Sequence, residues 1–495
     1  MKEEKAGIQI SAKAFLSSVG IIGALMIVAG ILTRVIPAGS YERIIEGGRE
    51  VIIPDSFTFT DGIVYPIWRW LTAPIEVLWG PDNVTIISIV AFIMIIGGTF
   101  AILDKSGILK YIMNGLVRKY EGNKYMLMGV MIFFFMFFGS VFGMFEELVA
   151  LVPIVVLLSY AMGWDSLVGL GMSALAAGFG FSTAMLNPFT LGIAQNLAGL
   201  PMFSGVLLRI PMFVIVYLIL FTYVKRYAKQ VEKDSTHSLV FEEDRANKER
   251  YSGNQVLEVL PNEKYLKKSV IIFTSCLGAV IIYIMVGLIM NTVFDNSALS
   301  DISLIVMALL FLVGGLVAGK ASRYTEFTEM PTKMMKDFLH GIGGIAPGAI
   351  LILMAMSVKY IITMGGVMDT ILYYASEQIT GMGPYTAALL IFALVLALNF
   401  FVGSGSAKAF LVIPIIAPLT DLVDVTRQTA VQAFCFGDGF SNMIYPTNPL
   451  LMIALSVTVV SYPKWFKFTW KLQAFTLAVC GLILIGTVFI GYGPF

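Results

Sequence analysis

Charged residues, histidine and cysteine are all scarce in this chain of 495 residues. Only 13% of the residues are charged, the formal net charge is +1, and there are two histidines. The chain therefore lacks the basic excess that binds nucleic acid, and a histidine-based metal site or a Ser/His/Asp triad has little support. Cys276, Cys435 and Cys480 are scattered, without the spacing of a metal site or a disulfide framework. Nothing in these counts predicts a cofactor.

A nucleotide-binding loop is also missing, because the pattern G-x-x-x-x-G-K-[ST] does not occur, and this argues against an ATP-driven pump. What fills the chain is apolar: 58% of the residues are hydrophobic, including 36 Phe and 27 Met. About 20 consecutive apolar residues cross a bilayer, and many such runs are present. The sequence predicts an all-α polytopic protein of the cell membrane. The first run, 14–36, is longer than a signal-peptide core, so we expect a retained transmembrane helix.

The chain contains an internal repeat. Asn187-Pro188 recurs 261 positions later as Asn448-Pro449, and the Gly-Phe-Ser that begins at Gly180 recurs 259 positions later. Pro153 and Gly107 have counterparts at these same two offsets, a proline and a glycine. Four matches in one order at nearly one offset predict two halves with a common fold.

The apolar runs and their interruptions predict five parts. In chain order they are a first transmembrane helix and outer loop over 1–82; a first repeat over 83–224, with a hairpin near 125–160 and a broken helix near 166–199; a cytoplasmic linker over 225–268; two linking transmembrane helices and a cytoplasmic loop over 269–340; and a second repeat over 341–495, with a hairpin near 384–420 and a broken helix near 427–459. Each arm of the first hairpin is marginal for a full crossing, so re-entrant hairpins are expected. The linker is interpreted as a solvated connection.

Charge predicts how the two repeats are oriented. The linker 225–268 carries ten Lys and Arg residues, which places it in the cytoplasm, together with the N-terminus. The amphipathic segment 104–124 has five positive residues, whereas its counterpart 364–383 has none. The two segments should face opposite sides, so the repeats are inverted, with nine full crossings, two hairpins and an outer C-terminus. Inverted repeats with broken helices are a recurring build for secondary transporters, although a water channel shares part of this geometry.

The two helix breaks are the predicted binding site. They carry hydroxyl and amide side chains that suit a carboxylate and a hard cation: Ser182, Thr183, Asn187, Ser441, Asn442, Thr447 and Asn448. Pro188 and Pro449 keep the breaks open, and Ser404 and Ser406 add hydroxyls at the second hairpin tip. The alternative is that each Ser or Thr bonds only the backbone of its own helix.

A few charges fall in these apolar surroundings. Glu146 and Glu147 lie at the first hairpin tip, and Lys408 aligns with Glu147 at the second. Because charge at membrane depth is costly, we expect Lys408 to face a substrate carboxylate and one glutamate to face a cationic group or a coupling ion; the alternative is a structural Glu–Lys bridge. Asp438, between two glycines, is a candidate H⁺ or Na⁺ site with Asn187 and Asn448, or else a helix cap. Lys359 is expected to extend toward the membrane surface.

Nearly the whole chain carries motifs similar to those of the YfcC/DcuC-type carriers of the ion-transporter superfamily. They include Gly143-Met-Phe-Glu-Glu, Asn187-Pro-Phe, Ser404-Gly-Ser-Ala-Lys-Ala, Phe436-Gly-Asp-Gly-Phe-Ser-Asn and Tyr445-Pro-Thr-Asn-Pro. The resemblance implies a homodimer in which a scaffold carries a mobile, elevator-type transport domain. Members are described as anaerobic C4-dicarboxylate carriers or as basic amino-acid antiporters.

The first hairpin tip departs from part of that superfamily. Sodium–dicarboxylate members carry Ser-Asn-Thr at each tip, where this chain has Glu146-Glu147. Two acidic groups would repel a dianion and favour an amine or guanidinium. We therefore expect exchange of an amino acid of the arginine/ornithine type, or of a small peptide, with a C4-dicarboxylate carrier coupled to H⁺ or Na⁺ as the second hypothesis. An integral membrane enzyme is a third hypothesis, which two pseudo-equivalent sites suit poorly.

Overall fold

The computed structural model describes residues 12–46, 49–60, 65–120, 122–251, 263–294, 303–324 and 329–493. The described chain is almost entirely helical, and ten of its helices are long and apolar enough to cross a membrane. Eight of them coincide with predicted crossings; the other two are arms of the predicted hairpins, Lys124–Phe142 and Gly405–Leu422. The ninth predicted crossing is divided into helices of 15 and 8 residues. The expectation of an all-α polytopic membrane protein is confirmed.

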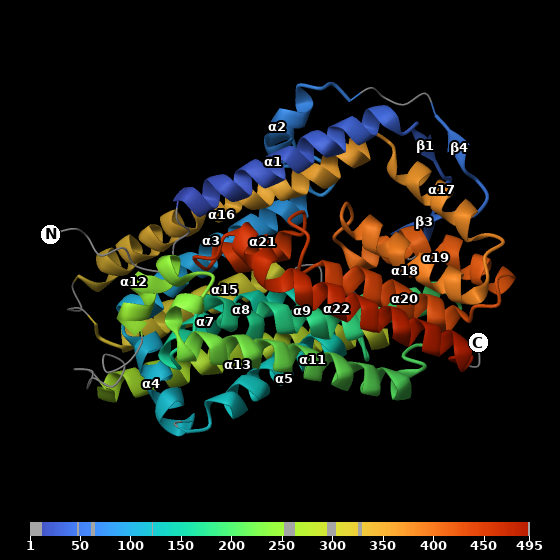
Figure 1. Ribbon diagram of the computed structural model, residues 1–495. Coiled ribbons are helices and arrows are strands. Elements are labelled where there is room, and N and C mark those ends of the chain that lie inside the picture. The colour runs from blue at the N-terminus through green and yellow to red at the C-terminus, as the bar shows by residue number, and fades with distance from the viewer. Residues whose placement is uncertain are drawn as a thin grey trace.

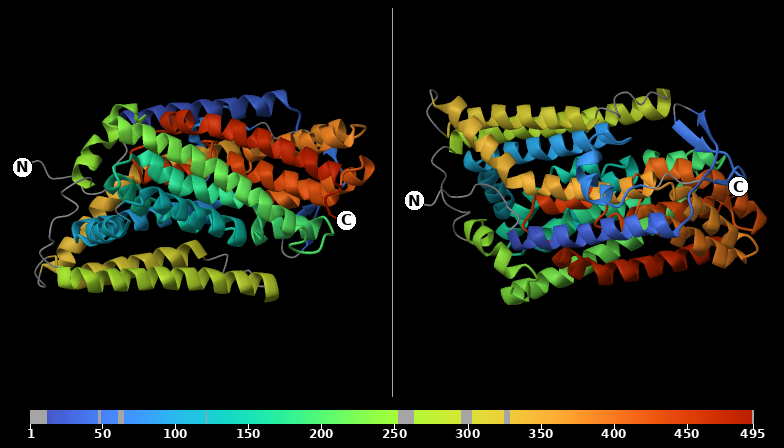
Figure 2. Two further views of the ribbon diagram at one scale, coloured as in Figure 1. Left: turned by 60° about the horizontal axis from the view of Figure 1, so that its bottom comes forward. Right: turned by 90° about the horizontal axis from the view of Figure 1, so that it is seen from above.

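In one group of helices, α16 packs mainly against α1, α2 and α3, and α15 packs between α3 and α13 (Figures 1 and 2). The group consists of α1 (Ala12–Val35), α2 (Arg69–Glu76), α3 (Asn83–Lys105), α13 (Glu263–Phe294), α15 (Ser303–Ala321) and α16 (Met330–Met364). Helices α3 and α16 approach closely because Gly341 faces Gly97, where a Cβ on Gly341 would lie 2.4 Å from the Gly97 carbonyl oxygen. We call these six helices the first helix group.

The second helix group contains both predicted hairpins and both broken helices. Its elements are α5 (Lys124–Phe142), α6 (Glu146–Val149), α7 (Val152–Ala161), α8 (Ser166–Met172), α9 (Ala174–Thr183), the π-helical turn η1 (Pro188–Gly192), α10 (Ile193–Leu197), α11 (Val206–Lys233), α18 (Pro384–Asn399), α19 (Gly405–Leu422), α20 (Arg427–Ser441), α21 (Pro449–Ser456) and α22 (Tyr462–Phe489). The segment α5–α7 returns to its starting end, because the Tyr125 ring lies 5.7 Å from that of Trp164. The turn is made at Gly143, whose φ of 65° favours glycine.

The two Gly-Phe-Ser motifs meet where α9 crosses α20. A Cβ on Gly439 would lie 2.3 Å from the Ser182 Cα, so no side chain fits there. Close by, the rings of Phe179 and Phe440 pack edge to face at 5.1 Å. The matched segments of the two repeats are therefore in direct contact at the centre of the second helix group.

The segment that was predicted as a polar outer loop has some regular structure. Strand β1 (Gly39–Ser40) pairs with β4 (Thr58–Phe59), and β2 (Arg43–Glu46) pairs with β3 (Arg49–Ile52), both antiparallel. Arg43 ties this segment to α17 (Met368–Ile379) through an ion pair of 2.7 Å with Asp369. Helix α17 and its counterpart α4 (Ile108–Tyr120) lie at opposite ends of the molecule (Figure 1).

The linker between the repeats differs from a solvated connection. Helix α11 continues nine residues beyond the predicted boundary, to Lys233, and is followed by the turn η2 (Ser235–His237) and helix α12 (Phe241–Tyr251). Asp244 of α12 is buried, with 1% exposure. It accepts hydrogen bonds of 2.7 Å from the Tyr160 hydroxyl and the Ser166 amide, which fix α12 to the second helix group.

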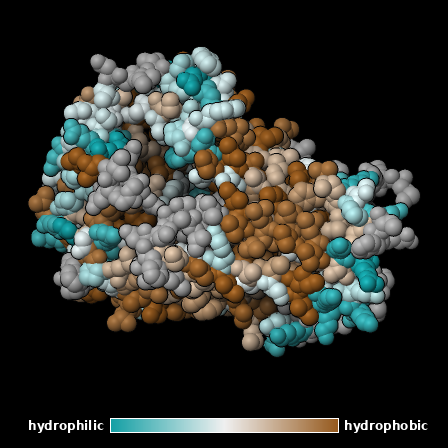
Figure 3. Space-filling model, turned by 180° about the vertical axis from the view of Figure 1, so that it is seen from behind, coloured by the Kyte–Doolittle hydropathy of each residue, from teal (hydrophilic) through white to brown (hydrophobic). Residues whose placement is uncertain are grey.

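The surface pattern agrees with a membrane location. Figure 3 shows a broad hydrophobic area, with hydrophilic residues gathered toward the two ends of the molecule. Large apolar side chains remain exposed on helices of both groups, among them Ile282 of α13 and Leu218 of α11. Such a continuous apolar surface is unusual for a soluble monomer and fits contact with lipid.

Candidate functional site

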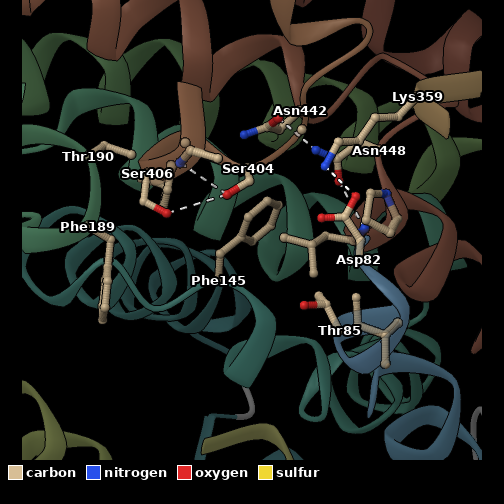
Figure 4. Close-up of a pocket in the computed structure, with 18 of the residues that line it drawn as sticks. Asp82, Thr85, Phe145, Phe189, Thr190, Lys359, Ser404, Ser406, Asn442 and Asn448 are labelled. Atoms are coloured by element: carbon tan, nitrogen blue, oxygen red, sulfur yellow. Dashed lines mark hydrogen bonds and ion pairs between the residues drawn. The ribbon is translucent and has the colours of Figure 1, made fainter. Parts of the chain in front are cut away.

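A cavity of about 340 Å³ lies between the first and second helix groups. From the second group it receives the hairpin tip 403–407 and residues next to both helix breaks (Figure 4). From the first group it receives residues of α3, α13 and α16. Both repeats and both helix groups therefore contribute to one cavity.

Three helical segments begin at this cavity, each capped by its own polar residue. Ser404 caps α19 by accepting from the Ala407 amide at 3.4 Å. Asn448 caps α21 by accepting from the Leu450 amide at 2.9 Å, and Asn187 caps the turn η1 by accepting from the Phe189 amide at 3.0 Å. Prolines follow both asparagines at the first helical position, where no amide hydrogen is needed. Helix N-termini carry partial positive charge and favour anions.

A buried polar network lies behind the second hairpin tip. The Lys408 ammonium donates to Asn399 Oδ1 and, at 2.6 Å, to Asp438 Oδ1. Asn399 Nδ2 donates to the Asp438 carbonyl at 2.8 Å and to Asn442 Oδ1 at 2.8 Å. Asn448 Nδ2 donates to the same Asn442 oxygen at 2.7 Å. The network thus joins the hairpin tip to both sides of the second helix break, and the side chains of Lys408 and Asp438 are 0% and 1% exposed.

The predicted role of Lys408 as a cavity residue does not match its position here. Its ammonium points to Asp438, and Lys408 is not among the residues that line the cavity. Asp438 is likewise behind the wall, and its second oxygen, Oδ2, has no hydrogen-bond partner among the described residues. That oxygen lies close to the start of α19, where a Cβ on Gly405 would be 2.8 Å away.

The other predicted residues fall into four sets. The ones that line the cavity are Ser404, Ser406, Asn442, Thr447 and Asn448. The ones whose hydroxyls bond carbonyls of their own helix are Ser182, Thr183 and Ser441. Asn187 and Pro188 form the start of η1, which brings Phe189 and Thr190 to the wall. Glu146 and Glu147 begin α6, next to the wall residue Phe145, but their side chains lie outside the described part of the structure.

The wall contributed by the first helix group carries an ion pair. Lys359 Nζ lies 2.6 Å from Asp82 Oδ2, and both residues line the cavity. The expectation that Lys359 extends to the membrane surface is wrong, because Asp82, at the start of α3, holds its ammonium at the cavity (Figure 4). In the part of the chain that the structure describes, no group of three His, Cys, Asp or Glu residues could hold a metal ion.

Comparison with known proteins identifies the family. The family model for DcuC, described as C4-dicarboxylate anaerobic carriers, matches residues 15–489. The chain belongs to the DcuC family. It is 32% identical over 414 residues to the Escherichia coli K12 protein named "Putative basic amino acid antiporter YfcC", a match that covers 82% of this chain and 79% of that protein. This DcuC-family chain is therefore a membrane transporter, as its relatives are named for carriage and exchange and not for catalysis.

Two solved transporter structures resemble this member of the DcuC family over nearly the whole chain. The Alcanivorax borkumensis YdaH transporter is 14% identical, with a TM-score of 0.42, and the match covers 97% of this chain and 99% of that one. The Neisseria gonorrhoeae protein MtrF, described as one of a class of antimetabolite efflux pumps, is 15% identical, with a TM-score of 0.40 and coverage of 95% and 94%.

The sequence interpretation missed three residues of this DcuC-family site. Asn399 could have been found from the repeat, because it lies 259 positions after Ser140, another polar residue in an apolar hairpin arm. Ser140 also reaches a helix break, where its hydroxyl is 2.9 Å from that of Thr183. Asp82 and Lys359 had no such signal, since they come from separate helices and only the fold brings them together.

Proposed function

We propose that this protein is a secondary active transporter that exchanges small amino acids bearing a carboxylate, with arginine/ornithine-type substrates as the best match. The observation that carries the proposal is the cavity shared by the two repeats and the two helix groups. The N-termini of α19 and α21 suit a carboxylate, while the aromatic wall of Phe145, Phe181 and Phe189 suits an aliphatic or cationic substrate body.

Movement of the second helix group against the first would expose the cavity to each side in turn. The placement of α4 and α17 at opposite ends supports inverted repeats, and the division into two helix groups supports a scaffold and an elevator-type transport domain. A homodimer remains part of the proposal through the family resemblance. In this scheme Asn442, Thr447 and Asn448 contact substrate, whereas Lys408 and Asp438 act behind the wall.

A C4-dicarboxylate is the second candidate, since the family is described by that substrate. The charges on the described wall favour an amino acid. Lys359 is paired with Asp82 there, so no described cation of the wall is left over for the second carboxylate of a dianion. An amino acid presents both signs of charge and matches a wall that does the same.

Counterflow tests this proposal. The purified protein is reconstituted into liposomes loaded with ornithine, aspartate or succinate, and uptake of labelled arginine or succinate is followed. We expect ornithine to drive arginine uptake, with saturation, because exchange returns the carrier loaded. Uptake driven only by succinate would establish the dicarboxylate hypothesis, and non-saturating flux without a load would indicate a channel.

Transport is expected to proceed without sodium. The Lys408 ammonium already lies between Asn399 Oδ1 and Asp438 Oδ1, which are oxygens of the kind that a hard cation would need. Replacing all Na⁺ by N-methylglucamine should leave the counterflow rate unchanged within about twofold. A steep dependence of the rate on Na⁺ concentration would contradict this assignment and would point to another cation site.

A further inference from the structure

The cavity wall formed by the first helix group holds two opposite charges, Asp82 and Lys359. Asp82 lies at the N-cap position of α3 but makes no side-chain cap bond there. Its carboxylate turns instead to Lys359, and their side chains are 43% and 23% exposed. Both charges are therefore accessible from the cavity, in contrast to the fully buried pair of Lys408 and Asp438.

The second helix group lines the same cavity as Asp82 and Lys359. The same cavity is lined by Ser404, Asn448 and Leu450 at the starts of α19 and α21, and Figure 4 shows Ser404 and Asn448 in one view with Asp82 and Lys359. A substrate carboxylate held at these N-termini would leave the rest of the molecule to point at Asp82 and Lys359. The two walls would then read different parts of one substrate.

We propose that Asp82 and Lys359 form a charge-selective subsite that reads the side chain of the transported amino acid, an inference that rests on the proposed function. A cationic side chain pairs with Asp82 and displaces the Lys359 ammonium; an anionic side chain pairs with Lys359 and displaces the Asp82 carboxylate. The ion pair keeps either charge from being left alone when no charged substrate group is bound. Lys359 competes with cationic substrates for Asp82, and Asp82 competes with anionic substrates for Lys359. Neutralising Lys359 should therefore favour cationic substrates, and neutralising Asp82 should favour anionic ones.

This competition predicts opposite shifts for two isosteric variants. In Lys359→Met, Asp82 is free for cationic substrates. The preference for arginine over aspartate, measured as the aspartate KM divided by the arginine KM, should rise by about tenfold or more. In Asp82→Asn, Lys359 is free for anionic substrates, and the same ratio should fall by about tenfold or more. The double variant Asp82→Asn/Lys359→Met should bind both classes with little preference.

Two controls separate selectivity from stability. The swap Asp82→Lys/Lys359→Asp keeps an ion pair while exchanging its two positions, so a merely structural pair predicts recovery of the unmutated selectivity. The variant Asp421→Asn removes an ion pair with Arg427 of similar exposure, between α19 and α20 and away from the cavity, and it should leave the KM ratio unchanged. Thermal unfolding in detergent reports whether each variant is folded.

The outcomes are distinguishable from failure of the proposed function. If the unmutated protein exchanges none of the amino acids, the proposed function fails and the variants need not be tested. If it does exchange them, and both single variants change arginine and aspartate uptake by the same factor, the subsite proposal is overturned. Opposite shifts in folded variants establish it.

Discussion

Replacing Lys408 by Met is expected to abolish transport and to lower the free energy of unfolding by about 3–5 kcal/mol. The substitution leaves the Asp438 carboxylate buried without its ammonium partner, because both side chains are at most 1% exposed. Asp438→Asn should destabilise the protein for the converse reason, with the ammonium left to Asn399 alone. Thermal unfolding in detergent and counterflow in liposomes measure the two effects separately.

The double variant Lys408→Met/Asp438→Asn decides what the pair does. With both charges removed, no buried ion is left uncompensated, and much of the lost stability should return. Transport should not return if the pair carries a proton or holds the hairpin tip in register with the second helix break. A double variant that transports normally would reduce the pair to a structural ion pair. Asp421→Asn provides the exposed control, for which a change of no more than about 1 kcal/mol is expected.

Lys408 and Asp438 are bonded to several parts of the candidate site. Lys408 belongs to the second hairpin and Asp438 to the broken helix, and Asn399 bonds both while also reaching Asn442. A change in the charge of one member would therefore alter contacts at the tip, at the break and at the cavity wall together. This makes the network a better candidate for coupling than the hydroxyls of Ser182 and Thr183, which bond carbonyls of their own helix and, for Thr183, the Ser140 hydroxyl.

The sequence predicts the secondary structure well because its signals are local. Apolar runs fixed most crossings, and an asparagine followed by proline correctly marked both breaks, since the amide caps the next helix and proline suits its first position. The repeat offset also paired the segments that meet at Gly439 and Ser182. These features depend on neighbours in the chain, or on short motifs that recur along it.

The sequence did not predict which groups form ion pairs with the individual charged residues. Lys408 was matched to Glu147 by position in the repeat, but its ammonium bonds Asp438, 30 residues away on another helix. Lys359 was placed by its distance from a helix end, whereas Asp82 holds it from 277 residues away. The choice among several polar partners is made by packing between helices, about which hydropathy and spacing carry no information.

The docking of α12 should weaken as the pH rises from about 4 to about 7. Burial, followed by repulsion from Asp165, raises the pKa of Asp244 from 3.8 to about 7, and burial also raises the pKa of Asp165. For a carboxyl group whose pKa is raised by docking, the stabilisation is complete below the undocked pKa and is lost above the docked one. A shift of about three units corresponds to about 4 kcal/mol of docking free energy.

The neighbours of this carboxyl pair determine the strength of the effect. Asp244 accepts from the Tyr160 hydroxyl and the Ser166 amide, and Asp165 accepts from the hydroxyls of Tyr227 and Ser238. The positive charge of Lys248 acts in the opposite direction to burial and lowers the pKa of Asp165. The Lys464–Glu243 pair of 2.6 Å joins α12 to α22 and supplies a contact whose strength does not depend on this titration.

Hydrogen exchange measures this docking directly, as protection factors corrected for the intrinsic pH dependence of exchange. Between pH 4 and 7 the protection of α12 amides should fall in the unmutated protein and then level off, whereas Asp244→Asn should keep it nearly constant, because the amide carries no charge to bury. Glu243→Gln is the matched control on the same helix: it should lower protection slightly at every pH and leave the slope unchanged. Protection that stays level across this range in the unmutated protein would show that Asp244 does not take up a proton when α12 docks. A falling slope that survives in Asp244→Asn would assign the titration to another group.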